Sequence, residues 1–197
     1  MPPTSAERLR AALAAGPGGG GSSDFDLNPG SAPAGAVLRP AGVLVAVTPD
    51  SELLLTKRSS QLRHHPGQIA FPGGKVDPGD DGVIGAALRE AEEEIGLPRD
   101  AVEVLGTLPP HRTVTGFAVT PVVALVTRAF DPVAEPGEVD EVFAVPLEHV
   151  LNPENYSVQG RIWRGAERHY YAVPWGPYYI WGATARMLRV LAERMAR

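Results

Sequence analysis

A short acidic segment, residues 77–94, constrains the fold of this chain more than any other stretch. It holds seven acidic residues and one base, Arg89, so its net charge is −6, whereas the whole chain of 197 residues carries −5. Apolar residues recur within it at helical spacing, which predicts an amphipathic helix from about residue 82 or 83 to residue 95. The residues expected to face the core are Ile84, Leu88, Ala91 and Ile95.

Both ends of this predicted helix carry residues that favour helix termini. Asp80 or Asp81 is placed to cap the N-terminus, where a negative charge also complements the helix dipole. Gly96 is placed to end the helix, and Pro98 lies just beyond it.

Three glutamates form a second face of the same helix. Glu90, Glu93 and Glu94 stand at i, i+3 and i+4, where like charges repel by a few tenths of a kcal/mol per pair, about the size seen in exposed helices. A solvated acidic surface is one interpretation. A site for Mg²⁺ or Mn²⁺ is the other, because these hard cations prefer carboxylate oxygens. The preceding Gly73-Gly74 favours the cation site, since a backbone without side chains lets carbonyl oxygens approach an ion.

Composition excludes several classes of protein. The chain is 44% hydrophobic and 21% charged, which is typical of one globular domain. It has no cysteine, so disulfides, thiolate metal sites and cysteine nucleophiles are excluded. The mild negative charge argues against nucleic acid as a partner. No apolar run approaches membrane-spanning length and no secretory leader is evident, so we expect a cytoplasmic protein without a membrane partner.

The N-terminal residues differ in composition from the rest of the chain. Residues 6–15 can form a short helix with Leu9 and Leu13 on one face. Residues 16–35 are rich in Gly, Pro, Ser and Ala. We therefore expect an N-terminal arm, residues 1–35, that is partly flexible, followed by a folded domain, residues 36–197. A helix that docks on the domain or on a second subunit is the alternative.

The remaining pattern alternates between strands and helices. An apolar run at residues 41–47 is followed by a turn and a returning strand at residues 52–56. A turn is expected at residues 164–167 and an amphipathic helix at 180–194. We expect a mixed α/β layered domain. Further strands are expected at residues 68–71, 101–107, 117–127, 139–145, 156–163 and 168–173.

Residues 89–97, REAEEEIGL, resemble the second half of the Nudix box at every position. The first half departs from the general pattern. Asp81 or Asp80 stands where glutamate is usual, and one extra residue separates it from Gly74. The resemblance implies a Nudix-type α/β/α sandwich with a mixed β-sheet.

The residues before the box resemble the coenzyme A diphosphatase branch of this family. Leu54-Leu55-Thr56, Arg58, Arg63, Gly67 and Phe71-Pro72-Gly73-Gly74 carry this similarity. It implies hydrolysis of the diphosphate of coenzyme A and its acyl derivatives, with Mg²⁺ or Mn²⁺, to 3′,5′-ADP and 4′-phosphopantetheine or its acyl form. The partner would be this small-molecule substrate, and a homodimer is compatible with the fold. The alternatives are a pyrophosphatase for ADP-ribose or another nucleoside diphosphate derivative, and a non-catalytic nucleotide-binding Nudix module.

The resemblance also implies roles for the acidic residues. Glu90 and Glu94 would be the principal metal ligands, with Glu93 as a ligand or the water-activating base. The Gly74 carbonyl can complete the coordination. Glu138 is the candidate for a carboxylate from outside the helix, as ligand or base, although Asp140 and Glu141 compete with it.

Basic and aromatic residues are assigned separately. Arg89 is expected to orient the glutamates by ion pairing. The candidates for contacting substrate are Arg58, Arg63, His65 and Gln68. The three tryptophans, Trp163, Trp175 and Trp181, are expected in the core rather than against an adenine ring.

Overall fold

The structure is a computed structural model that describes residues 3–14, 16, 20–32, 35–163 and 165–196. Its helices are α1 (Ser5–Ala14), α2 (Gly82–Ile95), α3 (Leu147–Leu151) and α4 (Ala183–Met195). Its strands are β1 (Ser22–Ser23), β2 (Arg39–Val47), β3 (Glu52–Arg58), β4 (Ile69–Ala70), β5 (Gly73–Lys75), β6 (Val102–Thr107), β7 (His111–Arg112), β8 (Phe117–Val126), β9 (Val139–Pro146), β10 (Ser157–Trp163) and β11 (Ala166–Ala172). No helix in this part of the chain is both long enough and apolar enough to cross a membrane.

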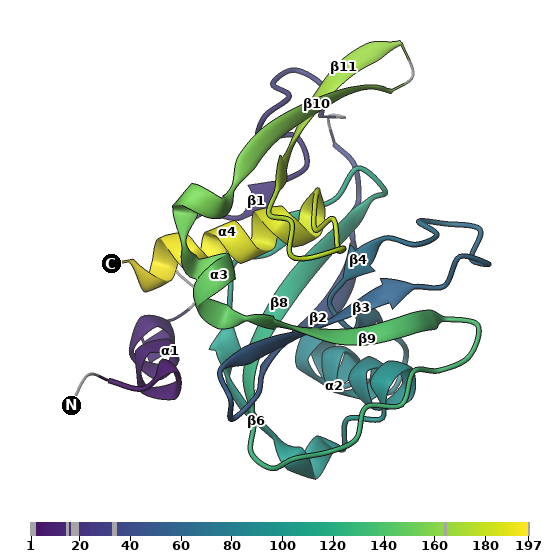
Figure 1. Ribbon diagram of the computed structural model, residues 1–197. Helices are drawn as coiled ribbons and strands as arrows, with labels where there is room; N and C mark the ends of the chain where they lie inside the picture. Colours follow the sequence, from purple (N-terminus) through teal and green to yellow (C-terminus); the bar gives the residue numbers. More distant parts are fainter. Residues whose placement is uncertain (1–2, 15, 17–19, 33–34, 164, 197) are drawn as a thin grey trace.

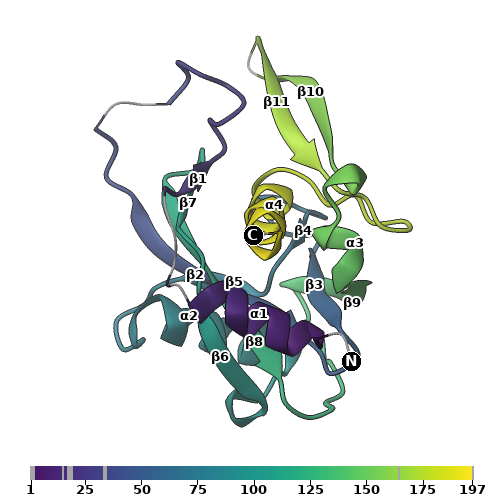
Figure 2. The ribbon, with the colours of Figure 1, turned by 90° about the vertical axis from the view of Figure 1, so that its left-hand side faces the viewer.

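A mixed sheet lies between α2 on one face and α4, α3 and α1 on the other (Figures 1 and 2). Among the described residues the sheet has nine strands. Its main order is β1-β7-β8-β2-β3-β4, while β5 pairs with β2, β6 with β8 and β9 with β3. The central pair, β2 and β8, is parallel along all of β2. This is the α/β/α sandwich that the sequence predicts.

Strand β2 shows why the sheet has two buried faces. Successive side chains of a strand point to opposite faces. Leu44 and Ala46 therefore pack on the side of α2, and Val45 and Val47 pack on the side of α4. A continuous apolar run is what a strand covered on both faces requires.

The hairpin predicted between residues 41–47 and 52–56 forms only next to its turn. Val47 pairs with Leu53, and β3 then separates from β2 to pair with β9 along its length. The residues of β5 take the free edge of β2 near its start, which explains the early separation. The sequence signal for β5 is short, and the prediction missed this strand.

Helix α2 has the predicted bounds, and Gly96 ends it in the left-handed conformation with φ of 68°. The predicted apolar stripe is wrong at one end, because Ile84 is exposed and Ala87 is buried in its place. Close packing on the sheet is the physical reason. A Cβ added at Gly42 of β2 would lie 1.9 Å from the carbonyl oxygen of Val83, so small residues must face the strand.

The first helix docks on the domain, as the alternative for the N-terminal arm proposed. Leu9 and Leu13 of α1 are buried in the core shared with α4. Further along, Ser22 Oγ lies 2.8 Å from His111 Nδ1, and His111 Nε2 lies 3.0 Å from Asp24 Oδ1. The expected flexibility falls partly on residues outside the described ranges, and the boundary at residue 36 stays a prediction.

The second sheet is the β10–β11 hairpin, which projects beyond the main sheet (Figure 2). Trp163 pairs with Ala166, so the turn is shorter than the predicted 164–167, and Arg164 lies outside the described residues. The last helix begins at Ala183 rather than 180, after Gly182 with φ of 65°. None of the three tryptophans is fully buried. Trp175 packs against the core, as expected, whereas Trp163 and Trp181 do not belong to it, which corrects the expectation for these two.

Candidate metal and substrate site

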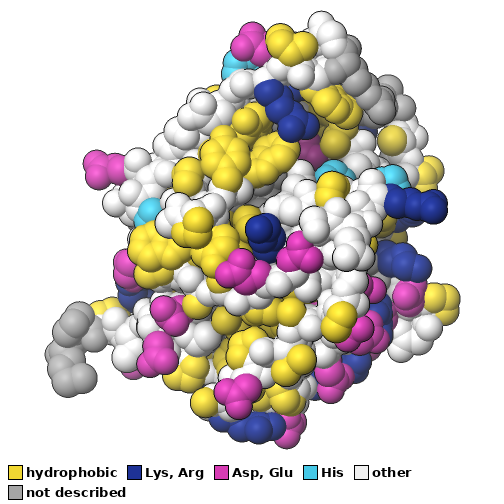
Figure 3. Space-filling view, turned by 45° about the vertical axis from the view of Figure 1, so that its right-hand side comes forward, with side chains coloured by type: hydrophobic (Ala, Val, Ile, Leu, Met, Phe, Trp, Pro, Cys, Tyr) yellow, Lys and Arg dark blue, Asp and Glu magenta, His cyan; other side chains and the backbone are white. Residues whose placement is uncertain are grey.

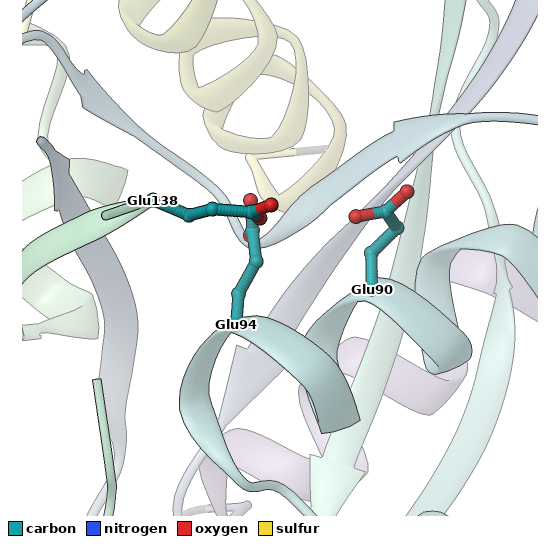
Figure 4. A group of neighbouring side chains, drawn as sticks. All are labelled: Glu90, Glu94 and Glu138. Carbon is teal, nitrogen blue, oxygen red and sulfur yellow. The ribbon is translucent and has the colours of Figure 1, made fainter. Parts of the chain in front are cut away.

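Three carboxylates converge beside α2. Glu90 and Glu94 lie one turn apart on the helix, and Glu138 comes from the segment that enters β9. One oxygen of each lies within 4.8 Å of the others, and the side chains extend into the same space (Figure 4). The structure thus places the predicted Glu138 beside two of the predicted helix glutamates.

Glu94 is the buried member of this group, with 5% of its surface exposed. The backbone N–H of Gly73 donates a hydrogen bond to its Oε2 at 3.1 Å. Burial raises the pKa of Glu94 to about 7, although the Gly73 hydrogen bond acts in the opposite direction and the charge of Glu90 adds to the rise. Burial also raises the pKa of Glu90. Ionised carboxylates crowded in this way are stabilised by a nearby cation.

The glycine turn of β5 makes room for the group. A Cβ added at Gly74 would lie 2.3 Å from Oε1 of Glu90. Gly73 has φ of 153°, and a Cβ there would collide with the backbone of β2. These two residues must therefore be glycine for α2 to bring its carboxylates against the strand.

The donor set fits a hard divalent cation. All three side chains offer carboxylate oxygens, which Mg²⁺ and Mn²⁺ prefer. Among the described residues, no basic side chain forms an ion pair with Glu94 or Glu138. A cation held by Glu90 and Glu94, with Glu138 as a further ligand or as the base beside it, would supply the missing positive charge.

Arg89 connects the acidic residues around this group. Its Nε donates to Asp80 Oδ1 at 2.9 Å, and its Nη1 donates to Glu90 Oε1 and to Glu93 Oε2, each at 3.0 Å. Arg89 therefore orients glutamates, as predicted. Its hydrogen bond also lowers the pKa of Asp80.

Different contacts distinguish the two aspartates that compete for the box position. Asp80 pairs with Arg89, and its Oδ2 accepts the backbone N–H of Asp77 at 2.8 Å. Asp81 stands at the N-cap position of α2 without a side-chain cap hydrogen bond. The predicted N-cap position is therefore confirmed at Asp81, although its side chain makes no cap hydrogen bond.

Glu93 lies outside the converging group. Its side chain is 57% exposed, and its carboxylate pairs with Arg89 instead. Residues at i and i+4 of a helix point in more similar directions than residues at i and i+3. The carboxylates of Glu90 and Glu94 therefore converge, and that of Glu93 lies outside their group.

The residues predicted to contact substrate lie in two parts of the structure. Arg58 lies at the end of β3, where its positive charge acts on Glu94 and its buried Nε has no hydrogen-bond partner in the described structure. Arg63 is exposed on the loop after β3, and no hydrogen bond or ion pair joins its side chain to another described residue.

His65 and Gln68 line a cavity of about 560 Å³ next to this loop. His65 has φ of 54°, a conformation uncommon for a residue with a side chain. Partial desolvation lowers the pKa of its ring, and the charge of Arg58 acts in the same direction. The same cavity is lined by Glu141, which competed with Glu138 in the prediction, and by five residues that were not predicted as site residues: Lys57, Arg161, Tyr178, Tyr179 and Trp181.

Comparison with known proteins finds a matching family model, similar sequences and a solved structure with the same fold. The family model described as NUDIX domain matches residues 38–164. The uncharacterized Nudix hydrolase NudL of Escherichia coli O7:K1 (strain IAI39) is 46% identical over 157 residues, which cover 78% of this chain and 81% of that protein. NudL of Shigella boydii serotype 18 matches with the same identity and coverage. The NUDIX domain of Shewanella oneidensis NrtR, solved in complex with ADP ribose, has the same fold, with a TM-score of 0.51, 17% identity, and coverage of 86% of this chain and 94% of that one.

Proposed function

This chain belongs to the Nudix family of diphosphate hydrolases, and we propose that it hydrolyses coenzyme A and acyl-coenzyme A. The convergence of Glu90, Glu94 and Glu138 is the observation that supports the chemistry. The segment from β3 to β5 supports the substrate, because the residues that resemble the coenzyme A branch lie along it. Arg58 acts on Glu94 at one end of the loop between β3 and β4, while His65 and Gln68 line the cavity at the other.

The reaction consumes one water molecule. Water attacks one phosphorus of the diphosphate, the P–O bond to the bridging oxygen breaks, and that oxygen leaves on the other phosphate. Coenzyme A then gives 3′,5′-ADP and 4′-phosphopantetheine, and an acyl derivative gives the acyl form of the second product. A bound Mg²⁺ or Mn²⁺, the divalent cations typical of this family, would neutralise the diphosphate and acidify the attacking water.

The carboxylates would have different roles in this reaction. Glu90 and Glu94 would hold the cation, with Gly73 fixing the orientation of Glu94 and Arg89 that of Glu90. Glu138 is exposed, so it would accept the proton of the attacking water and pass it to solvent. The Gly74 carbonyl and Glu93 are the further candidates for a ligand and a base.

Arg58 would contact the diphosphate. Its positive charge opposes the rise in the pKa of Glu94 that burial causes, so it would also attract a diphosphate held beside that carboxylate. A planar guanidinium binds two phosphate oxygens at once, which suits a charged group that must be held for in-line attack. Arg63, exposed on the same loop, is the second candidate for this contact.

Steady-state kinetics with Mg²⁺ tests the proposal. The value of kcat/KM for coenzyme A is expected to exceed that for ADP-ribose. A clear preference for ADP-ribose, or for another nucleoside diphosphate derivative, would replace coenzyme A as the substrate. If every such substrate stays intact with both Mg²⁺ and Mn²⁺, the chain is a nucleotide-binding module instead.

A further inference from the structure

The β10–β11 hairpin carries two arginines directly opposite each other. Arg161 pairs with Arg168 in the antiparallel register, so both side chains lie on one face of the hairpin. Like charges at opposed positions destabilise a pair of strands. Among the described residues no acid forms an ion pair with either guanidinium, and Nε of Arg168 is buried without a hydrogen-bond partner. The pair is therefore suited to an anion that comes from outside the chain.

One member of this pair belongs to the lining of the cavity of about 560 Å³, and the other lies opposite it on the same face of the hairpin. Arg161 lines it, with its guanidinium 4.8 Å from the centre of the Trp181 ring. Tyr170, two positions along β11 from Arg168, packs against Trp181 with ring centres 4.9 Å apart. In Figure 3 hydrophobic side chains gather in the upper half of the face with basic side chains among them. Positive charge and aromatic surface thus occur together in this cavity.

Glu141 is the one acidic residue among the described residues that line the cavity, and its carboxylate already accepts a hydrogen bond. The Tyr178 hydroxyl donates to its Oε1 at 2.5 Å, and the Tyr178 ring stacks on Phe143 with centres 3.6 Å apart. Lys57 lies across from Glu141 in the β3–β9 pair and also lines the cavity. The basic residues on this side therefore outnumber the acid.

The cavity and the cation site use nearby positions of the chain at the end of β3 and the start of β9. Lys57 of the cavity is followed by Arg58, which acts on Glu94. Glu141 of the cavity lies three residues after Glu138 of the acidic group. A substrate whose diphosphate lies at the carboxylates would reach the cavity past the end of β3 and the start of β9.

We propose that the cavity binds the 3′-phosphorylated adenosine half of the substrate, with Arg161 and Arg168 contacting the 3′-phosphate. The inference rests on the proposed function and specifies which half of that substrate lies here. A phosphate monoester carries close to two negative charges and binds guanidinium groups bidentately. Trp181 and Tyr179 offer aromatic surface to the adenine ring. The pantetheine half is uncharged and would leave both guanidinium groups without a partner.

Kinetic discrimination between coenzyme A and dephospho-coenzyme A, which lacks the 3′-phosphate, provides the first test. The wild type is expected to favour coenzyme A by at least about tenfold in kcat/KM, equivalent to one well-made charged contact. In the double variant Arg161→Gln, Arg168→Gln this ratio is expected to fall to near one. The matched control is Arg128→Gln, which removes a surface arginine paired with Asp100 and is expected to leave the ratio unchanged. An equal loss on both substrates, or no change in the ratio, overturns the proposal.

Binding without turnover provides the second test and separates this inference from the proposed function. Calorimetry with the full chain and a chelator compares adenosine 3′,5′-bisphosphate with AMP. The bisphosphate is expected to bind at least about tenfold more tightly, and the double variant is expected to lose this difference. This comparison stands even if coenzyme A is not hydrolysed, and it needs no variant to fold. Equal affinity of the wild type for the two nucleotides contradicts the inference.

Discussion

The Glu94 carboxyl group is buried among other carboxylates, so its charge state links stability to metal binding. Its pKa is raised from 4.5 to about 7 in the folded protein. Between these values the folded state binds more protons than the unfolded state, so the stability of the metal-free protein falls as pH rises. Because of this group the free energy of unfolding falls by about 3 kcal/mol in total, and the fall ends near pH 7.

Urea unfolding from pH 4.5 to 8 in the presence of a chelator measures this dependence. The Glu94→Gln variant is expected to show a shallower fall, because it removes the titrating group while keeping the shape of the side chain. Saturating Mg²⁺ is expected to oppose the fall in the wild type, since a bound cation favours the ionised carboxylate. Identical slopes for the wild type and the variant would contradict the account.

Arg89 gives a second prediction at the scale of one residue. Its guanidinium holds Asp80, Glu90 and Glu93 at once, and lysine cannot reproduce this geometry. Arg89→Lys is therefore expected to raise the Mg²⁺ concentration needed for half-maximal activity by about 10- to 100-fold, as the loss of an orienting partner does. The control is Arg99→Lys, since Arg99 pairs with the exposed Glu92 instead. An unchanged Mg²⁺ titration in Arg89→Lys would show that the arginine does not position a ligand.

At the scale of elements, the contact between α2 and β2 determines where the acidic face lies. A Cβ at Gly42 would lie 1.9 Å from the Val83 carbonyl oxygen, and a backbone atom cannot rotate away. Gly42→Ala is expected to destabilise the fold by about 3 kcal/mol, at the upper end of overpacking costs. Gly20→Ala is the control, because an added Cβ meets nothing within 4 Å there. Chemical denaturation of both variants measures the difference, and equal stabilities would refute the close packing.

A separate prediction follows from the docking of α1 on the domain. Leu9 is fully buried against the core that α4 completes. Leu9→Ala is expected to cost about 2–5 kcal/mol, as for other buried leucines. Val37→Ala, at a side chain that is 93% exposed, is expected to cost almost nothing. If both variants unfold at the same denaturant concentration, α1 does not contribute to the folded domain in solution.

For the whole molecule, local patterns in the sequence predicted the elements better than their pairing. The bounds of α2 follow from its own periodicity and from Gly96, and both were predicted. Its buried stripe was predicted incorrectly, because the demand for small residues comes from Gly42, forty residues earlier. The pairing of β3 with β9 also joins distant segments, so no local signal distinguishes it from a simple hairpin.

The residues of the candidate site were likewise predicted only in part. The helical spacing of Glu90 and Glu94 and the resemblance that suggested Glu138 predicted three side chains that the structure brings together. Their role as metal ligands remains a prediction. Arg161 and Arg168 were not predicted, because their opposition depends on the register of the hairpin rather than on any motif. Only the folded chain brings that hairpin to the cavity lined by Lys57 and Trp181.

Product analysis by mass spectrometry tests the central claim most directly. Coenzyme A is incubated with Mg²⁺ and either the wild type or Glu94→Gln, whose folding is verified by circular dichroism. The wild type is expected to give 3′,5′-ADP and 4′-phosphopantetheine in equal amounts. The variant is expected to lose more than about a hundredfold in rate, beyond the loss seen when only an orienting partner is removed. Intact coenzyme A with the wild type, or undiminished products with the variant, would contradict the account.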